Sequence, residues 1–208
     1  AKAPQNLQKF DAQESEALIL GFGRFGQVTG RILAANQIHF TALDKNADHI
    51  EFVKKFGNKV YYGDASRSEV LEAAGISKVR TVIVAIDDPK MSQAIVEFIV
   101  HQYPKIMVIA RAHNRNDYLA LKAAGAHSVV REVFAGALEA ATEALHALGY
   151  SDGQAMQKAE AFRLHDEGLL KKQAKVLGDS EKVIEIGRQG REELEAIFQQ
   201  DKQVTSRS

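Results

Sequence analysis

The sequence predicts an α/β fold, a doubly wound parallel sheet with a helical extension at its C-terminal end. Two observations support this prediction. Short apolar runs alternate with helix-compatible segments between residues 17 and 130, and such alternation is typical of a parallel sheet with helices on both faces. A glycine-rich turn also joins the first apolar run to the first helical segment, as it does in Rossmann-type sheets.

The glycine turn follows the first apolar run, Ala17–Leu20, and has the spacing G-x-G-x-x-G at Gly21, Gly23 and Gly26. Gly21 permits the tight turn out of the strand. Gly23 lets the backbone approach a pyrophosphate, and Gly26 lets the helix and strand pack closely. The N-terminus of the next helix would offer free N–H groups and a positive dipole end to an anion.

A second apolar run ends at Leu43 and is followed by Asp44. A carboxylate at this place suits the hydroxyl pair of a ribose, and it disfavours a 2′-phosphate and therefore NADP. Strand, glycines, helix, strand and acid in this order predict a nucleotide site. The alternative is a tight strand–helix turn that binds nothing.

The remaining strands of the sheet are predicted at residues 59–62, 81–86, 106–110 and 128–130. Helices are predicted at residues 46–56, 68–74, 90–103 and 117–124, and several of them end at Gly or Pro. Ligands of such sheets bind beyond the carboxyl ends of the strands. The candidate nucleotide-binding residues are therefore Gly21, Gly23, Arg24, Phe25, Gly26, Asp44, Lys45, Asp64, Ala65, Asp87 and Arg111.

Arg111 follows the fifth predicted strand. It is equally compatible with ligand contact and with a salt bridge to an acid of the crevice.

Composition excludes several classes of protein. The 208 residues are 45% hydrophobic and 26% charged, with a formal net charge of zero, so nothing recommends nucleic acid as a partner. The absence of cysteine excludes disulfides and thiol chemistry. No apolar run approaches the ~20 residues of a membrane span, and no signal peptide is visible. Residues 1–16 are polar and are predicted to be a linker that enters residues 17–132, the nucleotide-binding domain.

The pattern changes after Arg131. Residues 133–178 are predicted to be a helical extension, with helices at 135–148 and 154–166 and a continuation at 169–176 after a break at Gly168. Residues 179–208 form a polar tail, expected to be a solvated or partner-packed helix with an apolar stripe at Leu194, Ile197 and Phe198 and a disordered extreme end.

Residues 131–208 look too short and too helical to be the substrate domain of a dehydrogenase. The seven histidines, none of them at metal-ligand spacing, are His39, His49, His101, His113, His127, His146 and His165. No catalytic or metal-binding residue is therefore predicted. The sequence favours a nucleotide-binding regulatory module. The alternatives are a stand-alone NAD-dependent oxidoreductase and an assembly module with a vestigial glycine turn.

Four stretches carry a resemblance to a known family: GFGRFGQVTGRIL, LDKNADHIEFVKKFGNKVYYGDASRSEVLEAAGI, VIVAIDDP and IARAHNRNDYLALKAAGAHSVVREVFAGALEAA. They resemble the cytosolic regulatory domain of Kef-type potassium efflux systems, over roughly residues 17–170. The resemblance implies an RCK (KTN) domain that follows a membrane antiporter-like domain through a linker, on the cytoplasmic face of the inner membrane. It also implies a homodimer, AMP or NAD(H) in the Rossmann site, and potassium/proton antiport in the full system, and it leaves open an ancillary flavoprotein-type subunit.

The resemblance further implies a second ligand, because glutathione holds these systems closed and its adducts with electrophiles open them. It places glutathione contacts at Arg31 and Arg131, whose alternatives are an exposed helix residue and a salt bridge to Glu132. Phe56 matches an aromatic that senses the bulk of an adduct, and core packing is its alternative. The family's asparagine is replaced by Asp166, which can bind an ammonium but cannot donate to a carboxylate.

Overall fold

The computed structural model describes residues 15–46, residue 50 and residues 60–205. The chain forms two compact units. One contains the chain up to Ala112 together with Ala120–Val130, and the other contains His113–Leu119 together with the chain from Arg131 onward. The second unit is therefore assembled from two separate stretches of sequence.

The first unit is built on a six-stranded sheet with the strand order β3-β2-β1-β4-β5-β6. Its strands are β1 (Ala17–Leu20), β2 (Phe40–Asp44), β3 (Val60–Tyr62), β4 (Thr81–Val84), β5 (Met107–Ala112) and β6 (Ser128–Arg131). The pairs β1–β2, β1–β4, β2–β3 and β4–β5 are parallel. This is the doubly wound order of Rossmann-type sheets, so the predicted fold class is confirmed.

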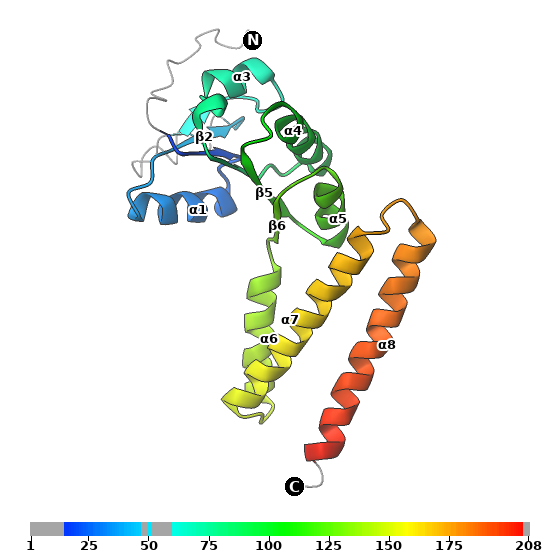
Figure 1. Ribbon diagram of the computed structural model, residues 1–208. Coiled ribbons are helices and arrows are strands. Elements are labelled where there is room, and N and C mark those ends of the chain that lie inside the picture. The colour runs from blue at the N-terminus through cyan, green and yellow to red at the C-terminus, as the bar shows by residue number, and fades with distance from the viewer. Residues whose placement is uncertain (1–14, 47–49, 51–59, 206–208) are drawn as a thin grey trace. The chain divides into compact units, whose positions relative to one another are not determined.

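The strand order creates a crevice at the centre of the sheet. From β1 the chain moves outward to β2 and β3, and it then returns to β4 on the other side of β1. Because crossovers between parallel strands are right-handed, α1 (Arg24–Ala35) and α4 (Pro89–Gln102) cover opposite faces (Figure 1). The loops after β1 and β4 diverge at this switch point, where ligands of such sheets bind.

Shorter helices complete the first unit. They are α3 (Ser68–Ala73), the 3-10 helix η1 (Ile76–Lys78) and the C-terminal part of α5 (Arg115–Ala123). The helix predicted at residues 46–56 lies largely outside the described residues.

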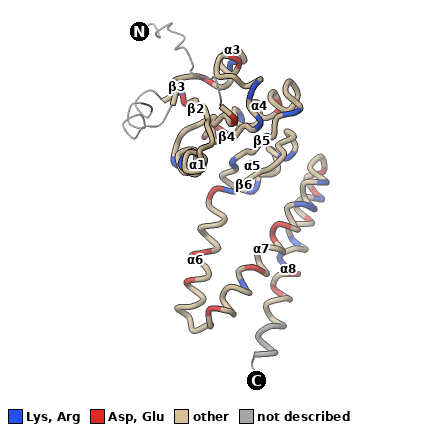
Figure 2. Tube along the Cα trace, turned by 60° about the vertical axis from the view of Figure 1, so that its left-hand side comes forward, with Lys and Arg blue, Asp and Glu red and all other residues tan. Residues whose placement is uncertain are grey.

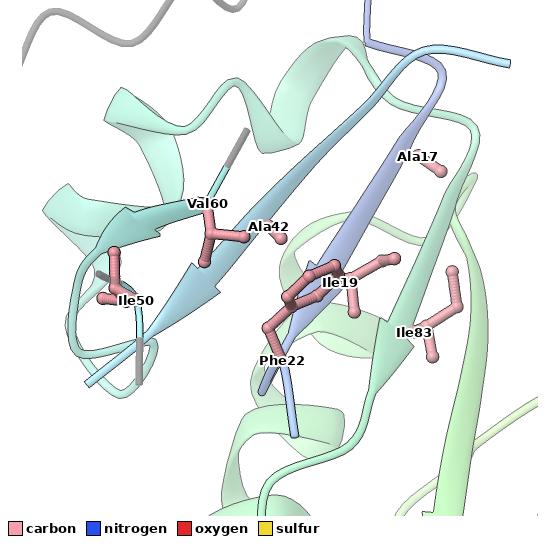
Figure 3. Close-up of a cluster of buried hydrophobic side chains, with 7 residues drawn as sticks. All are labelled: Ala17, Ile19, Phe22, Ala42, Ile50, Val60 and Ile83. Atoms are coloured by element: carbon pink, nitrogen blue, oxygen red, sulfur yellow. The ribbon is translucent and has the colours of Figure 1, made fainter. Parts of the chain in front are cut away.

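A buried cluster packs around β1 and holds the glycine turn in place (Figure 3). Its members are Ala17, Ile19, Phe22, Ala42, Ile50, Val60 and Ile83. All four residues of β1 are buried, as expected for a central strand covered on both faces. Phe22, inside the glycine turn, is fully buried, so the turn is anchored by a core side chain.

The second unit contains three long helices, α6 (Phe134–Ala147), α7 (Asp152–Ala174) and α8 (Ser180–Thr205). α7 packs against both α6 and α8 (Figure 1). A capping box starts α7, because the hydroxyl of Ser151 accepts from the Gln154 N–H and the Gln154 side chain accepts from the Ser151 N–H.

One expectation about this unit was wrong. α7 runs through Gly168 without a break, because contacts of its buried neighbours Asp166 and Leu170 outweigh the cost of about 1 kcal/mol for a glycine in a helix. The polar tail is helical, as expected, and it packs on α7 of its own chain. The side chain of Gln173 donates to the Val183 carbonyl at 2.9 Å, and a Cβ at Gly190 would lie 2.5 Å from Leu169 Cδ1.

Candidate functional site: a nucleotide crevice

The three motif glycines have different surroundings. Gly21 has φ +90°, and a Cβ there would lie 2.5 Å from the carbonyl oxygen of Ala85. A Cβ on Gly26 would lie 2.4 Å from the carbonyl oxygen of Gly21. A Cβ on Gly23, in contrast, would meet no atom within 4 Å. Packing therefore requires glycine at Gly21 and Gly26, whereas at Gly23 the space is open, as an approaching phosphate requires.

The start of α1 supplies the anion-binding groups. Gly23 is its N-cap, no side chain caps the helix, and its first turn has no acidic residue. The first N–H groups of a helix have no acceptor within that helix, and the helix dipole favours an anion there. The turn can therefore bind a phosphate through backbone groups alone.

Asp44 is held rigidly at the end of β2. Its carboxylate accepts the backbone N–H of Phe22 at 2.8 Å through one oxygen and that of Asn46 at 2.8 Å through the other. The first bond ties the acid to the glycine turn, and the second ties it to the loop after β2. Ionised carboxylates accept several hydrogen bonds, so a side chain of this type at this place suits the two hydroxyls of a ribose.

Glycine turn and acid line one cavity of about 530 Å³. Its lining contains seven of the predicted nucleotide-binding residues: Gly21, Gly23, Asp44, Lys45, Asp64, Ala65 and Asp87. It also contains Asn46 and Met91, which the sequence did not single out. Asp88, which the sequence places beside Asp87 at the crevice, lines the cavity as well, and its side chain caps α4 by accepting from the Met91 N–H.

The other four predicted residues are placed differently in the described part of the chain. Arg24 is exposed, Phe25 packs against the core cluster, and both lie in the first turn of α1. Gly26 is buried below Gly21. Arg111 is buried and pairs with the exposed carboxylate of Asp87 at 2.7 Å, which is the salt bridge considered from the sequence.

Carboxylates dominate the rim of the crevice. The hydroxyl and the backbone N–H of Ser66 both donate to Asp64, and these bonds hold the pKa of Asp64 below its usual value. Asp64 therefore stays ionised near neutral pH. The crevice thus combines acceptors for hydroxyl groups at its rim with an anion site at α1, which is the arrangement that a nucleotide requires.

The second unit brings together two of the predicted glutathione residues. Arg131 Nη1 lies 2.6 Å from Asp166 Oδ2, although the sequence suggested Glu132 as the acid. Arg115, which the sequence did not single out, donates to Asp166 Oδ1 at 2.7 Å. No spacing signal could have found this contact, because the two residues are 51 positions apart.

The remaining two predicted glutathione residues do not belong to the second unit. Arg31 is exposed on α1 in the first unit. Phe56 lies outside the described residues. Within the described ranges, no group of three or more acidic or histidine side chains could hold a metal ion, and no helix is both long and apolar enough to cross a bilayer.

Comparison with known proteins gives the family. The model of the TrkA-N domain matches residues 17–132, which include the whole crevice. The chain belongs to the TrkA-N family. Residues 136–208 of this TrkA-N protein match a second model, the potassium efflux system KefB C-terminal domain, so the resemblance to Kef regulatory domains is confirmed.

Individual relatives agree with the two family models. The glutathione-regulated potassium-efflux system protein KefC of Escherichia coli O157:H7 is 36% identical over 202 residues, which are 97% of this chain and 33% of KefC. This TrkA-N protein thus spans about a third of the length of the curated relatives that it matches.

Solved structures agree as well. The Shewanella denitrificans Kef CTD in AMP-bound form is 38% identical with a TM-score of 0.70, over 77% of this chain and 98% of that one. GsuK bound to ADP is 26% identical with a TM-score of 0.51, over 62% of this chain and 33% of that one.

The role of Asp44 can be tested from both sides of the contact. Asp44→Ala is expected to weaken AMP binding by ~1.5–3 kcal/mol, because it removes hydrogen bonds from ribose hydroxyls to a charged group. 2′-Deoxy-AMP should bind the parent chain more weakly than AMP does, whereas Asp44→Ala should no longer distinguish the two ligands. Isothermal titration calorimetry measures all four affinities. A variant that still prefers AMP would show that the ribose contacts another group.

Proposed function

We propose that this chain is the ligand-gated regulatory domain of a bacterial potassium efflux system of the potassium/proton antiport type. The observation that carries the proposal is the combination of a complete nucleotide crevice with a C-terminal region that matches the KefB C-terminal domain. Relatives of both parts belong to potassium transport systems. This supports a regulatory role over a stand-alone oxidoreductase.

The proposed nucleotide is AMP or NAD(H). A phosphate would bind at the start of α1, and the ribose would donate to Asp44, whose two backbone bonds fix its position. A relative that is 38% identical is described as AMP-bound. A 2′-phosphate beside the Asp44 carboxylate would be repelled, so NADP is not proposed.

The proposed second ligand is glutathione, which would inhibit efflux, while its adducts would activate it. Arg31, Phe56, Arg131 and Asp166 would form the site at the interface of a homodimer. Support comes from the name of the KefC relative, a glutathione-regulated system, and from the ion pair that brings Arg131 and Asp166 together. Arg31 and Arg131 as separated cations, with Asp166 as the acid, would suit a ligand that has two carboxylates and one ammonium.

The greater length of the relatives suggests a membrane transport part as the main partner. Two thirds of KefC lies outside the region that this chain matches, and we assign the membrane transport part of the system to the corresponding region. The regulatory domain would then act on the cytoplasmic face of the inner membrane. An ancillary flavoprotein-type subunit is a further proposed partner.

A chimera tests the regulatory role. The matched third of E. coli KefC would be replaced by this chain, and potassium loss from cells would be followed after an electrophile that forms glutathione adducts is added. We expect potassium loss only after the electrophile is added. Asp44→Ala and Arg131→Gln should each change the amount of potassium that is lost. A chimera that is present in the membrane and never responds, while KefC itself does, would contradict the proposal.

A further inference from the structure

The carboxylate of Asp166 is shared between two arginines. Oδ1 accepts a hydrogen bond from Arg115 Nη1 at 2.7 Å, and Oδ2 lies 2.6 Å from Arg131 Nη1. Asp166 is only 8% exposed. Two cations and one anion leave the cluster with one unit of positive charge in excess, so it can take a further carboxylate.

The two oxygens of Asp166 are not held equally. Oδ2 is buried and forms the ion pair with Arg131 Nη1, but it accepts no hydrogen bond from the part of the chain that the structure describes. Arg131 has a second support, because its guanidinium carbon lies 3.4 Å from the centre of the Phe134 ring, an attractive cation–π contact. Oδ2 is therefore the exchangeable end of Asp166, and Arg131 keeps its place when this oxygen moves.

Arg115 has an unused donor next to the same carboxylate. Its Nε donates to Gln173 Oε1 at 2.9 Å, and Gln173 is itself fixed by its bond to the Val183 carbonyl of α8. Arg115 Nη2 is buried and has no hydrogen-bond partner in the described chain. The bond from Nε to Gln173 thus orients the guanidinium of Arg115. At its outer end, Nη1 is bonded to Asp166 and Nη2 is not bonded.

We propose that Asp166 and Arg115 form a carboxylate-exchange switch for the ligand that binds at Arg131. In the described state, Asp166 bridges the two arginines. When a carboxylate of the ligand takes Arg131, Asp166 Oδ2 turns to Arg115 Nη2, so that Asp166 pairs with Arg115 through both oxygens and remains beside the ligand. The inference rests on the proposed function for the identity of the ligand, which is glutathione.

Electrostatics explains why the exchange needs Arg115. A buried carboxylate that loses one partner without gaining another carries a penalty of several kcal/mol, and this penalty would be subtracted from the affinity for the ligand. An arginine can take both oxygens of a carboxylate through its planar fork, whereas a lysine is a point charge with no such geometry. Arg115 is therefore a positioning residue that acts through Asp166 without touching the ligand.

A double-mutant cycle separates this role from direct contact. Glutathione would compete with a fluorescent glutathione S-conjugate on the parent, Arg115→Lys, Asp166→Asn and the double variant. In the parent background, Arg115→Lys should weaken glutathione about tenfold or more, as expected for a lost bond to a charged group. In the Asp166→Asn background the same change should alter the glutathione affinity by less than about twofold, because a neutral amide does not need a second cationic partner when it leaves Arg131.

Two further variants complete the experiment. Arg163→Lys is the matched control, because Arg163 lies on the same helix as Asp166 but pairs with the more exposed Glu160 and Glu167, and it should leave the affinity unchanged. Gln173→Ala, which releases the edge of Arg115, should reproduce the background-dependent loss and replaces Arg115→Lys if that variant does not fold.

The outcomes divide clearly. An equal loss of glutathione affinity in both backgrounds would mean that Arg115 contacts the ligand directly. No loss in either background would mean that Arg115 does not take part. Each of these results overturns the exchange. A parent chain that binds no glutathione overturns the proposed ligand and the exchange with it, whereas parent binding without the predicted coupling overturns the exchange alone.

Discussion

Replacing Gly26 with alanine is expected to destabilise the first unit by about 3 kcal/mol or more. A Cβ there would lie 2.4 Å from the carbonyl oxygen of Gly21. That oxygen belongs to a residue at φ +90° whose N–H donates to the Leu43 carbonyl at 2.8 Å, so it cannot move without disturbing β1 and β2. Overpacking costs typically 1–3 kcal/mol and more where backbone must shift, which is a large part of the stability of a domain.

The matched control is Gly23→Ala, in the same turn. Gly23 has φ −69°, and its Cβ would meet no atom within 4 Å, so urea unfolding should differ from the parent by less than about 0.5 kcal/mol. Titration with AMP should nevertheless show a large loss, because the added methyl group occupies the approach to the anion site. Normal AMP binding by Gly23→Ala would show that the phosphate does not bind at this turn.

Asp166→Ala is the second change with a large expected effect. It leaves the two guanidinium groups beside one another without their shared anion, and breaking a buried pair in this way costs about 3–5 kcal/mol. Because Arg115 is 32% exposed, the lower end of this range applies. Asp166→Asn should cost less, since the amide oxygen can still accept from one arginine.

Glu160→Ala provides the comparison on the same helix. Glu160 also pairs with an arginine of α7, but its side chain is 53% exposed and that of Arg163 is 35% exposed. Exposed ion pairs of this kind contribute about 0–1 kcal/mol. Urea unfolding of both variants at the same ionic strength would test the difference. Similar small losses for the two would mean that the Asp166 cluster is as well solvated as a surface pair.

The sequence predicted the crevice well because its parts are local. Gly26 is needed because of a contact within one strand–helix turn, Gly21 has φ +90° in that same turn, and Asp44 is the last residue of its strand. A short buried strand and the acid at its end are formed by consecutive residues, so sequence patterns can detect both. Figure 2 shows the charged residues along the chain, and the acids of the crevice come from the end of β2 and from the loops after β3 and β4, where they were expected.

The sequence was a poor guide where tertiary contacts decide. The glycine at 168 reads as a break, but Leu170 is buried and carries the helix across it. The tail after residue 179 reads as a solvated or partner-packed helix because most of its side chains are polar. Its attachment uses the backbone carbonyls of Val183 and Gly190, which lie 2.9 Å from Gln173 Nε2 and 2.7 Å from His165 Nε2, and side-chain polarity does not report carbonyl partners.

The stretch His113–Leu119 belongs to the helical unit although β6 follows it in the chain. Recombination between relatives at the boundary of the two family models, near residue 134, would therefore separate Asp166 from Arg115 and Arg131. A hybrid gene would keep its charge cluster only if both parents carried compatible residues at these positions. The C-terminal region is thus a separate module in sequence comparisons, but it cannot simply be exchanged between relatives. Exchanges should succeed more often when the stretch around Arg115 is exchanged together with it.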